Sequence, residues 1–249
     1  MNWIKLKNIM LCFLIFMNIL LLGIISLSTL IEENIPENAV NSGIQILKND
    51  GFDCSFDVFP KKYESIPTLT SKFYSATELS EIFFEKQVAF KTEENSLIAT
   101  NGNATLVITD NLFTYKTAEA VVNASPSKLL KKLKKLGIDM QGAVYDEKNK
   151  RFIKQYDGFN IFNMYLDVRL NKDDDICYAS GLWPIITSVG ENKHLSFSSH
   201  VLKVKELFPN GGNITKIQLG YSINDIRKGK IAFIPSWEIT VNKETKILS

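Results

Sequence analysis

The sequence from residue 9 to residue 31 reads IMLCFLIFMNILLLGIISLSTLI and contains no charged side chain. Its 23 residues exceed the roughly 20 apolar residues that a helix needs to cross the hydrocarbon core of a bilayer. Lys5 and Lys7 precede this run, and Glu32 and Glu33 follow it. Because lysines favour the cytoplasmic side, the charge bias predicts a transmembrane helix over residues 9–31 and a cytoplasmic tail over residues 1–8.

A cleaved signal peptide is the alternative to a permanent anchor. Its apolar region is typically about 7 to 15 residues long and ends at a small-residue cleavage site. The run in this chain is longer, and Ser26-Leu27-Ser28 is only a weak substitute for an A-x-A site. Cys12 lies deep inside the run, which argues against a cleaved lipoprotein. We therefore expect a single-pass protein of the cell membrane with an extracytoplasmic C-terminal domain.

The chain beyond residue 31 is electrically balanced. All 27 acidic residues lie there, and removing Lys5 and Lys7 from the 29 basic residues leaves 27. A nucleic-acid-binding domain would be strongly basic, so we expect no nucleic-acid partner. This part is long enough for one large domain or two small domains with real cores.

A first helix-and-sheet pattern follows the apolar run. A helix is expected after Pro36, from apolar residues at helical spacing, and Thr77 with Glu78 and Glu81 predicts the start of another helix over residues 77–85. Between them, Phe52, Cys54 and Phe56 alternate with polar residues as in a half-buried strand, and Pro60 and Pro67 break the pattern that follows. Asn101-Gly102 then predicts a hairpin between strands at residues 97–100 and 104–109, and a third strand follows. The helix is expected to cover the apolar face of this meander.

A second pattern begins at Ser125, a good N-cap residue that is followed by Pro126 and by a predicted helix over residues 127–136. Another helix is expected over residues 199–208. Strands are expected at residues 142–145, 152–156, 161–170, 176–180, 214–221 and 231–241. This order of elements predicts an α+β fold of two helix-on-antiparallel-sheet units, over residues 32–122 and 123–249.

The sequence contains no pattern typical of catalysis or of metal binding. G-x-S-x-G, H-E-x-x-H, Walker-type and dinucleotide-binding glycine patterns do not occur. His194 and His200 have no cysteine neighbour and are expected at the surface. Asp173-Asp174-Asp175 lacks the glycine and the distant glutamate of a calcium loop and is interpreted as a turn. We expect no enzyme activity, no cofactor and no metal.

Two further features have more than one interpretation. Cys54 and Cys177 either form one disulfide or remain two free thiols. Their spacing in the sequence does not show whether the two residues are in contact, so both interpretations stay open. Lysines cover one side of the helix at residues 127–136, opposite its leucines. This lysine side either faces solvent, which we favour, or meets anionic lipid or wall polymer.

Asn18 is the one amide near the middle of the apolar run. An amide that faces lipid leaves its hydrogen-bonding groups unpaired, so Asn18 favours a partner helix, with a lone tolerated amide as the alternative. At 100° per residue, Leu11, Asn18, Leu22, Ile25 and Thr29 fall on one stripe of the helix. These five residues are the predicted partner-binding face. Interhelical hydrogen bonds of this kind contribute about 0.6 to 2 kcal/mol each.

Both ends of the chain carry motifs that resemble a known family. MNWIKLK at residues 1–7 leads directly into the apolar run, and PSWEI at residues 235–239 lies close to the C-terminus, after Gly220-Tyr221. These motifs and the layout resemble the YycI family. Proteins of this family are membrane-anchored regulators of the cell-wall two-component system of low-GC Gram-positive bacteria. That system is called WalK/WalR or YycG/YycF. The resemblance implies a non-catalytic regulator that acts with a sister protein, YycH, and contacts the membrane helices of the sensor histidine kinase.

Two other functions remain as alternatives. The first is a membrane-tethered module that binds an envelope ligand, which requires a well-formed pocket with convergent polar groups. The second is a wall-directed hydrolase, which requires two carboxylates at a working separation in a groove. We favour the regulator.

Overall fold

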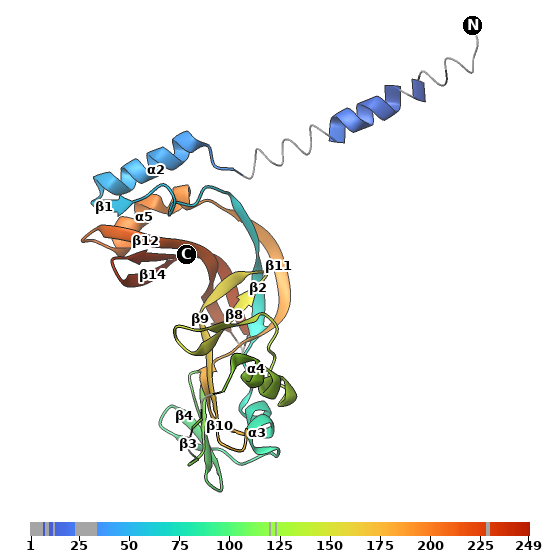
Figure 1. The fold of residues 1–249 in the computed structure, drawn as a ribbon, viewed down its shortest axis with the longest axis vertical. Coiled ribbons are helices and arrows are strands. Elements are labelled where there is room, and N and C mark those ends of the chain that lie inside the picture. Colours follow the sequence, from blue (N-terminus) through green and yellow to red (C-terminus); the bar gives the residue numbers. More distant parts are fainter. Residues whose placement is uncertain are drawn as a thin grey trace. The chain divides into compact units, whose positions relative to one another are not determined.

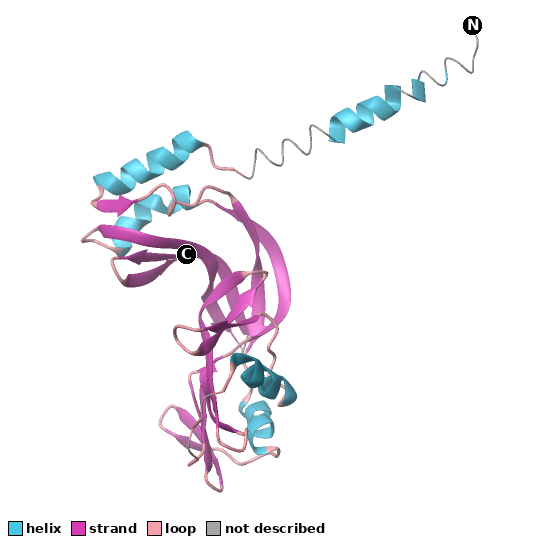
Figure 2. Ribbon diagram, in the orientation of Figure 1, coloured by secondary structure: helices cyan, strands magenta, loops and turns pink. Residues whose placement is uncertain are grey.

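The computed structural model describes residues 7, 10, 11, 13–22, 34–119, 121, 122, 124–227 and 230–249. The fold is mixed α+β, in agreement with the predicted class, and a large open sheet with few helices dominates it (Figures 1 and 2). The chain divides into two compact units. Unit 1 contains the described residues up to Ile66 together with Lys193–Ile217 and Ile239–Lys246, and unit 2 contains Pro67–Asn192, Gln218–Glu238 and Ile247–Ser249.

The helices are short and lie close to their predicted positions. They are α2 (Glu37–Asn49), α3 (Ala76–Phe84), α4 (Pro126–Lys135), the 3-10 helix η1 (Phe197–His200) and α5 (Val201–Leu207). Ser75 begins α3 with a capping box, in which its side chain accepts a hydrogen bond from the Glu78 N–H and the Glu78 carboxylate accepts one from the Ser75 N–H. The helix predicted over residues 199–208 consists of η1 followed by α5.

The sheet is mixed, because β12 runs parallel to β9. Its strands are β1 (Phe52–Cys54), β2 (Glu64–Lys72), β3 (Lys91–Glu93), β4 (Ser96–Asn101), β5 (Ala104–Thr109), β6 (Leu112–Lys116), β7 (Ala143–Asp146), β8 (Arg151–Tyr156), β9 (Phe159–Leu170), β10 (Ile176–Leu182), β11 (Ile185–Leu195), β12 (Gly212–Arg227), β13 (Lys230–Val241) and β14 (Glu244–Leu248). Their order is β11-β2-β13-β12-β9-β10-β6-β5-β4-β3. The expectation of purely antiparallel sheets is therefore wrong.

Unit 1 is built around α2. Val40, Ile44 and Leu47 recur at helical spacing, and all three are buried. β1 follows α2 and pairs in parallel with the start of β12, where Phe52 lies opposite Gly212. The Phe59 and Phe197 rings meet edge to face with their centroids 5.4 Å apart.

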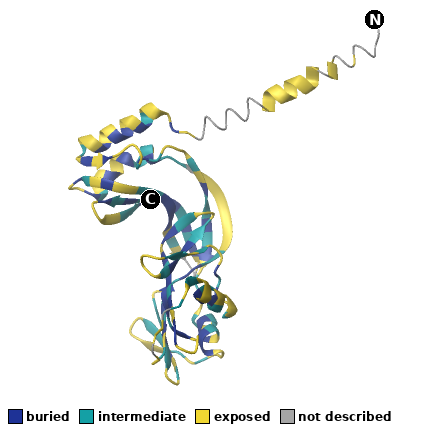
Figure 3. Ribbon diagram, viewed as in Figure 1, coloured by how far each residue is buried: buried dark blue, intermediate teal, exposed yellow. Residues whose placement is uncertain are grey.

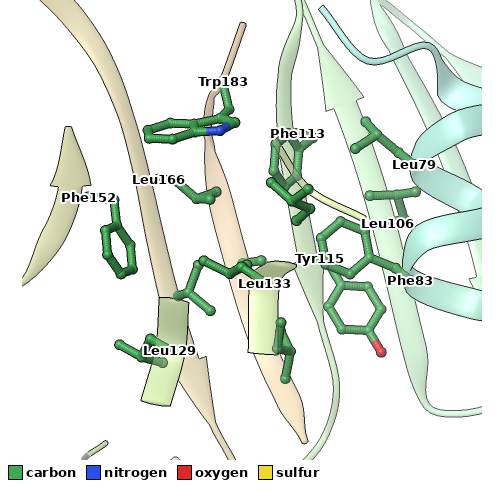
Figure 4. Close-up of a cluster of buried hydrophobic side chains, with 14 of the residues drawn as sticks. Leu79, Phe83, Leu106, Phe113, Tyr115, Leu129, Leu133, Phe152, Leu166 and Trp183 are labelled. Atoms are coloured by element: carbon green, nitrogen blue, oxygen red, sulfur yellow. The ribbon is translucent and has the colours of Figure 1, made fainter. Parts of the chain in front are cut away.

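Unit 2 has one hydrophobic core that both α3 and α4 cover. Figure 4 shows side chains of both helices converging on the same strands. The labelled members of this core are Leu79, Phe83, Leu106, Phe113, Tyr115, Leu129, Leu133, Phe152, Leu166 and Trp183. The predicted hairpin at Asn101-Gly102 is present, because β4 pairs with β5 through it.

The compact units divide the chain differently from the predicted units at residues 32–122 and 123–249. β6, the last strand of the meander, pairs antiparallel with β10, and Lys116 lies opposite Tyr178. This pairing joins the meander to strands that were predicted in the other unit, so α3 and α4 share one core instead of covering separate sheets. Long-range strand pairing of this kind leaves no local sequence signal.

Four strands have no counterpart among the predictions. β2 contains Pro67, which was interpreted as a break. β2 pairs with β13 from Leu69 to Lys72, and Pro67 precedes these pairs. Proline is tolerated in a strand where no ladder hydrogen bond is needed. The other three are β3, β11 and β14.

The N-terminal helix is described at Met10, Leu11 and residues 13–22. Within the described parts of the chain, no helix is both long and apolar enough to cross a membrane. The predicted span over residues 9–31 also includes Ile9, Cys12 and residues 23–31, which lie outside the described residues.

Candidate functional site

Every described residue of the N-terminal helix from Met10 to Leu22 is exposed, and the helix is yellow in Figure 3. The exposed fraction of its large apolar residues runs from 39% at Met17 to 64% at Phe13. Leu11, Asn18 and Leu22, three members of the predicted partner-binding face, are helical and exposed, and helix geometry places them within about 40° of one another. The other two members, Ile25 and Thr29, lie outside the described residues.

Asn18 uses part of its hydrogen-bonding capacity within its own helix. Its Nδ2 donates a hydrogen bond of 2.8 Å to the carbonyl oxygen of Leu14, one turn earlier. Such a bond to the preceding turn reduces the cost of a polar side chain in an apolar surrounding. The side-chain oxygen and the second amide hydrogen are then the groups with which Asn18 can bind a partner helix.

The two cysteines outside the apolar run are free thiols, and both are buried. Burial is the largest cause that raises the pKa of Cys54, to about 11, and the adjacent Asp53 carboxylate raises it further. Burial also raises the pKa of Cys177. A thiol is a nucleophile only as thiolate, so neither cysteine is suited to catalysis near neutral pH.

The lysine side of α4 contacts the aspartates that follow β9. Lys128 Nζ lies 2.5 Å from Asp174 Oδ1, and Lys132 Nζ lies 2.7 Å from Asp175 Oδ1. The aspartates are in a turn, as predicted. Exposed pairs of this kind contribute about 0 to 1 kcal/mol each, so these contacts orient the turn more than they stabilise the fold.

A cavity of about 640 Å³ in unit 2 gathers polar groups from three parts of the chain. Asp139, Gln141 and Gly142 come from the loop after α4, and Lys154 to Asp157 come from β8 and its following turn. Ile186 to Val189 of β11 complete the lining. The cavity therefore combines two carboxylates, one ammonium group, two amides, two hydroxyls and the Tyr156 ring.

Lys154 is the most unusual member of this lining, because a lysine side chain is seldom buried. Only 1% of its side chain is exposed, and its Nζ forms a salt bridge of 2.8 Å with Asp139 Oδ2. Its Nζ also lies 5.0 Å from the centroid of the buried Trp183 ring, in a cation–π arrangement. Burial lowers the pKa of Lys154, and this effect outweighs the raising effect of the Asp139 carboxylate.

Asp139 is the centre of the hydrogen bonds around Lys154. Its backbone N–H donates to the Tyr74 hydroxyl at 2.6 Å, and its carbonyl oxygen accepts from Trp183 Nε1 at 2.7 Å. Its second carboxylate oxygen accepts from the Gln141 N–H at 3.0 Å. Burial raises the pKa of Tyr74. With its backbone and its carboxylate both bonded, Asp139 is held in place against Lys154.

Gly142 is required by the backbone at the rim of the cavity. Its φ is +67°, and a Cβ at this position would lie 2.0 Å from the carbonyl oxygen of Gln155. The Gln155 N–H in turn donates to the Gly142 carbonyl oxygen at 2.8 Å. This close approach ties the loop after α4 to β8 and so brings Asp139 and Lys154 together.

The arrangement is suited to holding a polar ligand. A buried lysine with a lowered pKa in a cavity is a candidate functional group, although a structural ion pair is also a common cause of such a shift. Because Asp139 neutralises Lys154, the cavity does not attract anions strongly. Within the described residues, no group of three or more His, Cys, Asp or Glu side chains is placed to hold a metal ion.

Sequence reasoning found the strand that carries Lys154 but not the site. Phe152, Lys154 and Tyr156 alternate along β8, and a lysine between two aromatic residues on the core side was the available signal. Its partner Asp139 lies in a loop, so the pair becomes evident only from the fold. The predicted face on the N-terminal helix and this cavity are separate features.

Comparison with known proteins gives no family. No family model matches the chain, and no curated protein matches it. Among solved structures, an uncharacterized protein from Eubacterium rectale is similar at 11% identity and a TM-score of 0.44, over 75% of this chain and 82% of that chain. The Bacillus megaterium YpeB C-terminal domain is a distant neighbour at 12% identity and a TM-score of 0.30, over 72% of this chain and 99% of that chain.

Proposed function

We propose that this chain is a non-catalytic, membrane-anchored regulator of a cell-envelope two-component system. In this proposal, residues 9–31 span the cell membrane with the N-terminus in the cytoplasm, and the α+β part lies outside. The chain acts with a YycH-like protein on a WalK/YycG-like sensor histidine kinase through its transmembrane helix. The resemblance of the terminal motifs to the YycI family supports the choice of these partners.

The observation that carries the proposal is the exposed apolar surface of the N-terminal helix. All twelve of its described residues from Met10 to Leu22 are exposed, and all except Asn18 are apolar. A soluble protein seldom leaves such a continuous apolar surface in water, whereas lipid accepts it without cost. The lysines before the run and the glutamates after it support the orientation.

Asn18 gives this helix a polar point of contact. Because one amide hydrogen of Asn18 is bonded to Leu14, a partner helix has one further hydrogen and the side-chain oxygen to bind. Leu11 and Leu22 flank Asn18 on the same stripe and would pack around that contact. A contact of about 0.6 to 2 kcal/mol is sufficient to bias helix pairing, which is the scale on which regulation operates.

The test is association of the full chain with the kinase in a bacterial two-hybrid assay. Asn18→Leu is expected to weaken association, whereas the control Phe16→Leu, on the opposite side of the helix, is expected to leave it unchanged. Equal association of Asn18→Leu and the unaltered chain would count against the proposal. A second experiment replaces residues 9–31 with an unrelated span and crosslinks in membranes, and the replacement is expected to lose the kinase.

Binding of an envelope ligand is the second candidate function, and the cavity around Lys154 and Asp139 favours it. Its volume and its convergent polar groups are typical of a ligand site. If the cavity binds a wall fragment, soluble muropeptides will raise the melting temperature of the unaltered chain and not that of Lys154→Met. Equal shifts in both proteins would show binding elsewhere.

A further inference from the structure

β11 forms one edge of the sheet. It pairs with β2 on one side, and no other strand of the described chain pairs with it on the other side. Residues 187–193 of β11 are all exposed (Figure 3). The backbone N–H and C=O groups along such an edge are a template for another strand.

The two ends of the main strand order, β11 and β3, differ in their protection against pairing. β3, at the opposite edge, has only three residues, and Lys91 and Glu93 place a charge at each end. A very short, charged strand is a usual protection of an edge. β11 has eleven residues and no proline, and its two charged residues, Glu191 and Lys193, are of opposite sign. Val189 in this strand is 51% exposed. The β11 edge is therefore open to a further strand.

The sequence of β11 is complementary to itself in the antiparallel direction. When two copies of β11 pair antiparallel around a two-fold axis at Asn192, Val189 of one copy lies opposite Leu195 of the other. Glu191 of each copy then lies opposite Lys193 of the other. All four residues share one face of the strand, because successive side chains alternate between faces. Apolar residues thus meet apolar residues, and each acidic residue meets a basic one.

The two nearest registers on the same face of the strand are unfavourable. An axis at Glu191 would place the two Glu191 side chains opposite each other, and an axis at Lys193 would do the same with the two lysines. Like charges directly opposite each other destabilise strand pairing, whereas opposite charges stabilise it. The charges on β11 therefore favour the register at Asn192 over these two registers.

We propose that the β11 edge is a self-association surface, through which residues 189–195 of two copies of this chain pair antiparallel about a two-fold axis at Asn192. Such a pairing is closed, because it uses the open edge of both copies. Its small area makes the dimer weak in solution. The membrane anchor of the proposed function would raise the effective concentration of the two strands, but the pairing itself does not require that function.

Charge reversal tests the register in the full chain. Glu191→Lys places lysine opposite Lys193, and Lys193→Glu places glutamate opposite Glu191. In sedimentation equilibrium of detergent-solubilised protein, each single variant is expected to raise the dimer Kd about tenfold or more. The double variant E191K/K193E restores both pairs, and its Kd is expected within about threefold of the unaltered chain.

Each other outcome overturns the proposal. A dimer that the single variants leave unchanged forms through another surface, such as the N-terminal helix. A double variant as weak as the single variants excludes this register. A chain that stays monomeric at every concentration has no such surface. Both positions are exposed, so these substitutions are not expected to disturb the fold.

Disulfide trapping tests the axis independently of affinity. Residues opposite each other in an antiparallel pair have Cα atoms about 4.5 to 5.5 Å apart, which a disulfide can bridge. In a Cys12→Ser background, Asn192→Cys is expected to crosslink with itself. Glu191→Cys and Lys193→Cys are expected to crosslink with each other when mixed and not alone. Equal crosslinking of all three variants alone would overturn the proposal.

Discussion

Lys154 and Asp139 form a salt bridge of 2.8 Å in which the two partners differ greatly in exposure. The lysine side chain is 1% exposed, whereas the aspartate side chain is 30% exposed. Water can therefore solvate the carboxylate if the lysine is removed, but it cannot easily reach the ammonium group if the carboxylate is removed. The stability of this region thus depends more on Asp139 than on Lys154.

The first prediction compares removal of each partner. Asp139→Ala leaves a buried ammonium group without its carboxylate and is expected to lower the free energy of unfolding by about 3 to 5 kcal/mol. Lys154→Met keeps the volume and removes the buried charge, so its expected cost is below about 2 kcal/mol. Urea unfolding followed by tryptophan fluorescence measures both, because Trp183 is in contact with the pair. Equal costs would contradict the prediction.

Gly142 and Gly102 provide a matched pair for the second prediction. Both have a positive φ, of +67° and +61°, but a Cβ at residue 142 would meet Gln155 O at 2.0 Å while a Cβ at residue 102 would meet nothing within 4 Å. Gly102→Ala is expected to cost about 1 kcal/mol, the backbone term alone. Gly142→Ala adds a clash with the backbone and is expected to cost more than about 2 kcal/mol. Similar melting temperatures for the two variants would show that the loop after α4 can move.

Local sequence signals predicted the elements that depend on neighbouring residues. α2 follows from Val40, Ile44 and Leu47, which are all buried, and the β4–β5 hairpin follows from Asn101-Gly102. β11 was missed because most of it is exposed and its polar residues do not alternate with apolar ones. The strand partners of β6 and β12 were missed because pairing between distant segments has no local signal.

The candidate sites likewise include features that local sequence predicts and features that depend on the fold. The apolar run and the position of Asn18 could be predicted because they depend on composition and helical spacing. The hydrogen bond from Asn18 to Leu14 joins residues four apart, so it too follows from helix geometry. The cavity could not be predicted, because Asp139 and Lys154 meet only through the turn that Gly142 permits.

Leu133 tests the shared core of α3 and α4. Its side chain is 0% exposed within the core of unit 2. Leu133→Ala is expected to lower the free energy of unfolding by about 2 to 5 kcal/mol, from lost burial and the cavity that remains. Leu202, on α5, is 70% exposed, and Leu202→Ala is expected to change stability by less than about 0.5 kcal/mol. If Leu133→Ala cost as little as Leu202→Ala in urea unfolding, α4 would not be packed on this core.

Cys54 is expected to make the folded chain less stable at alkaline pH. Its pKa is raised from 9.0 to about 11, first by burial and then by Asp53, so the folded state holds the thiol proton more tightly than the unfolded state does. The stability from this group is fully present below pH 9 and is lost as the pH rises through 11. The full loss amounts to about 3 kcal/mol, from roughly 1.4 kcal/mol per pKa unit.

Comparison with Cys54→Ala isolates this contribution. The variant has its own cost from lost packing, but that cost does not change with pH. The raised pKa values of Tyr74 and Tyr221 and the lowered pKa of Lys154 also affect alkaline stability, but these groups are present in both proteins and cancel in the difference. Urea unfolding at intervals between pH 8 and pH 11 is therefore expected to show the two free energies converging as the pH rises. Parallel curves would mean that the Cys54 thiol ionises as easily in the folded chain as in the unfolded one.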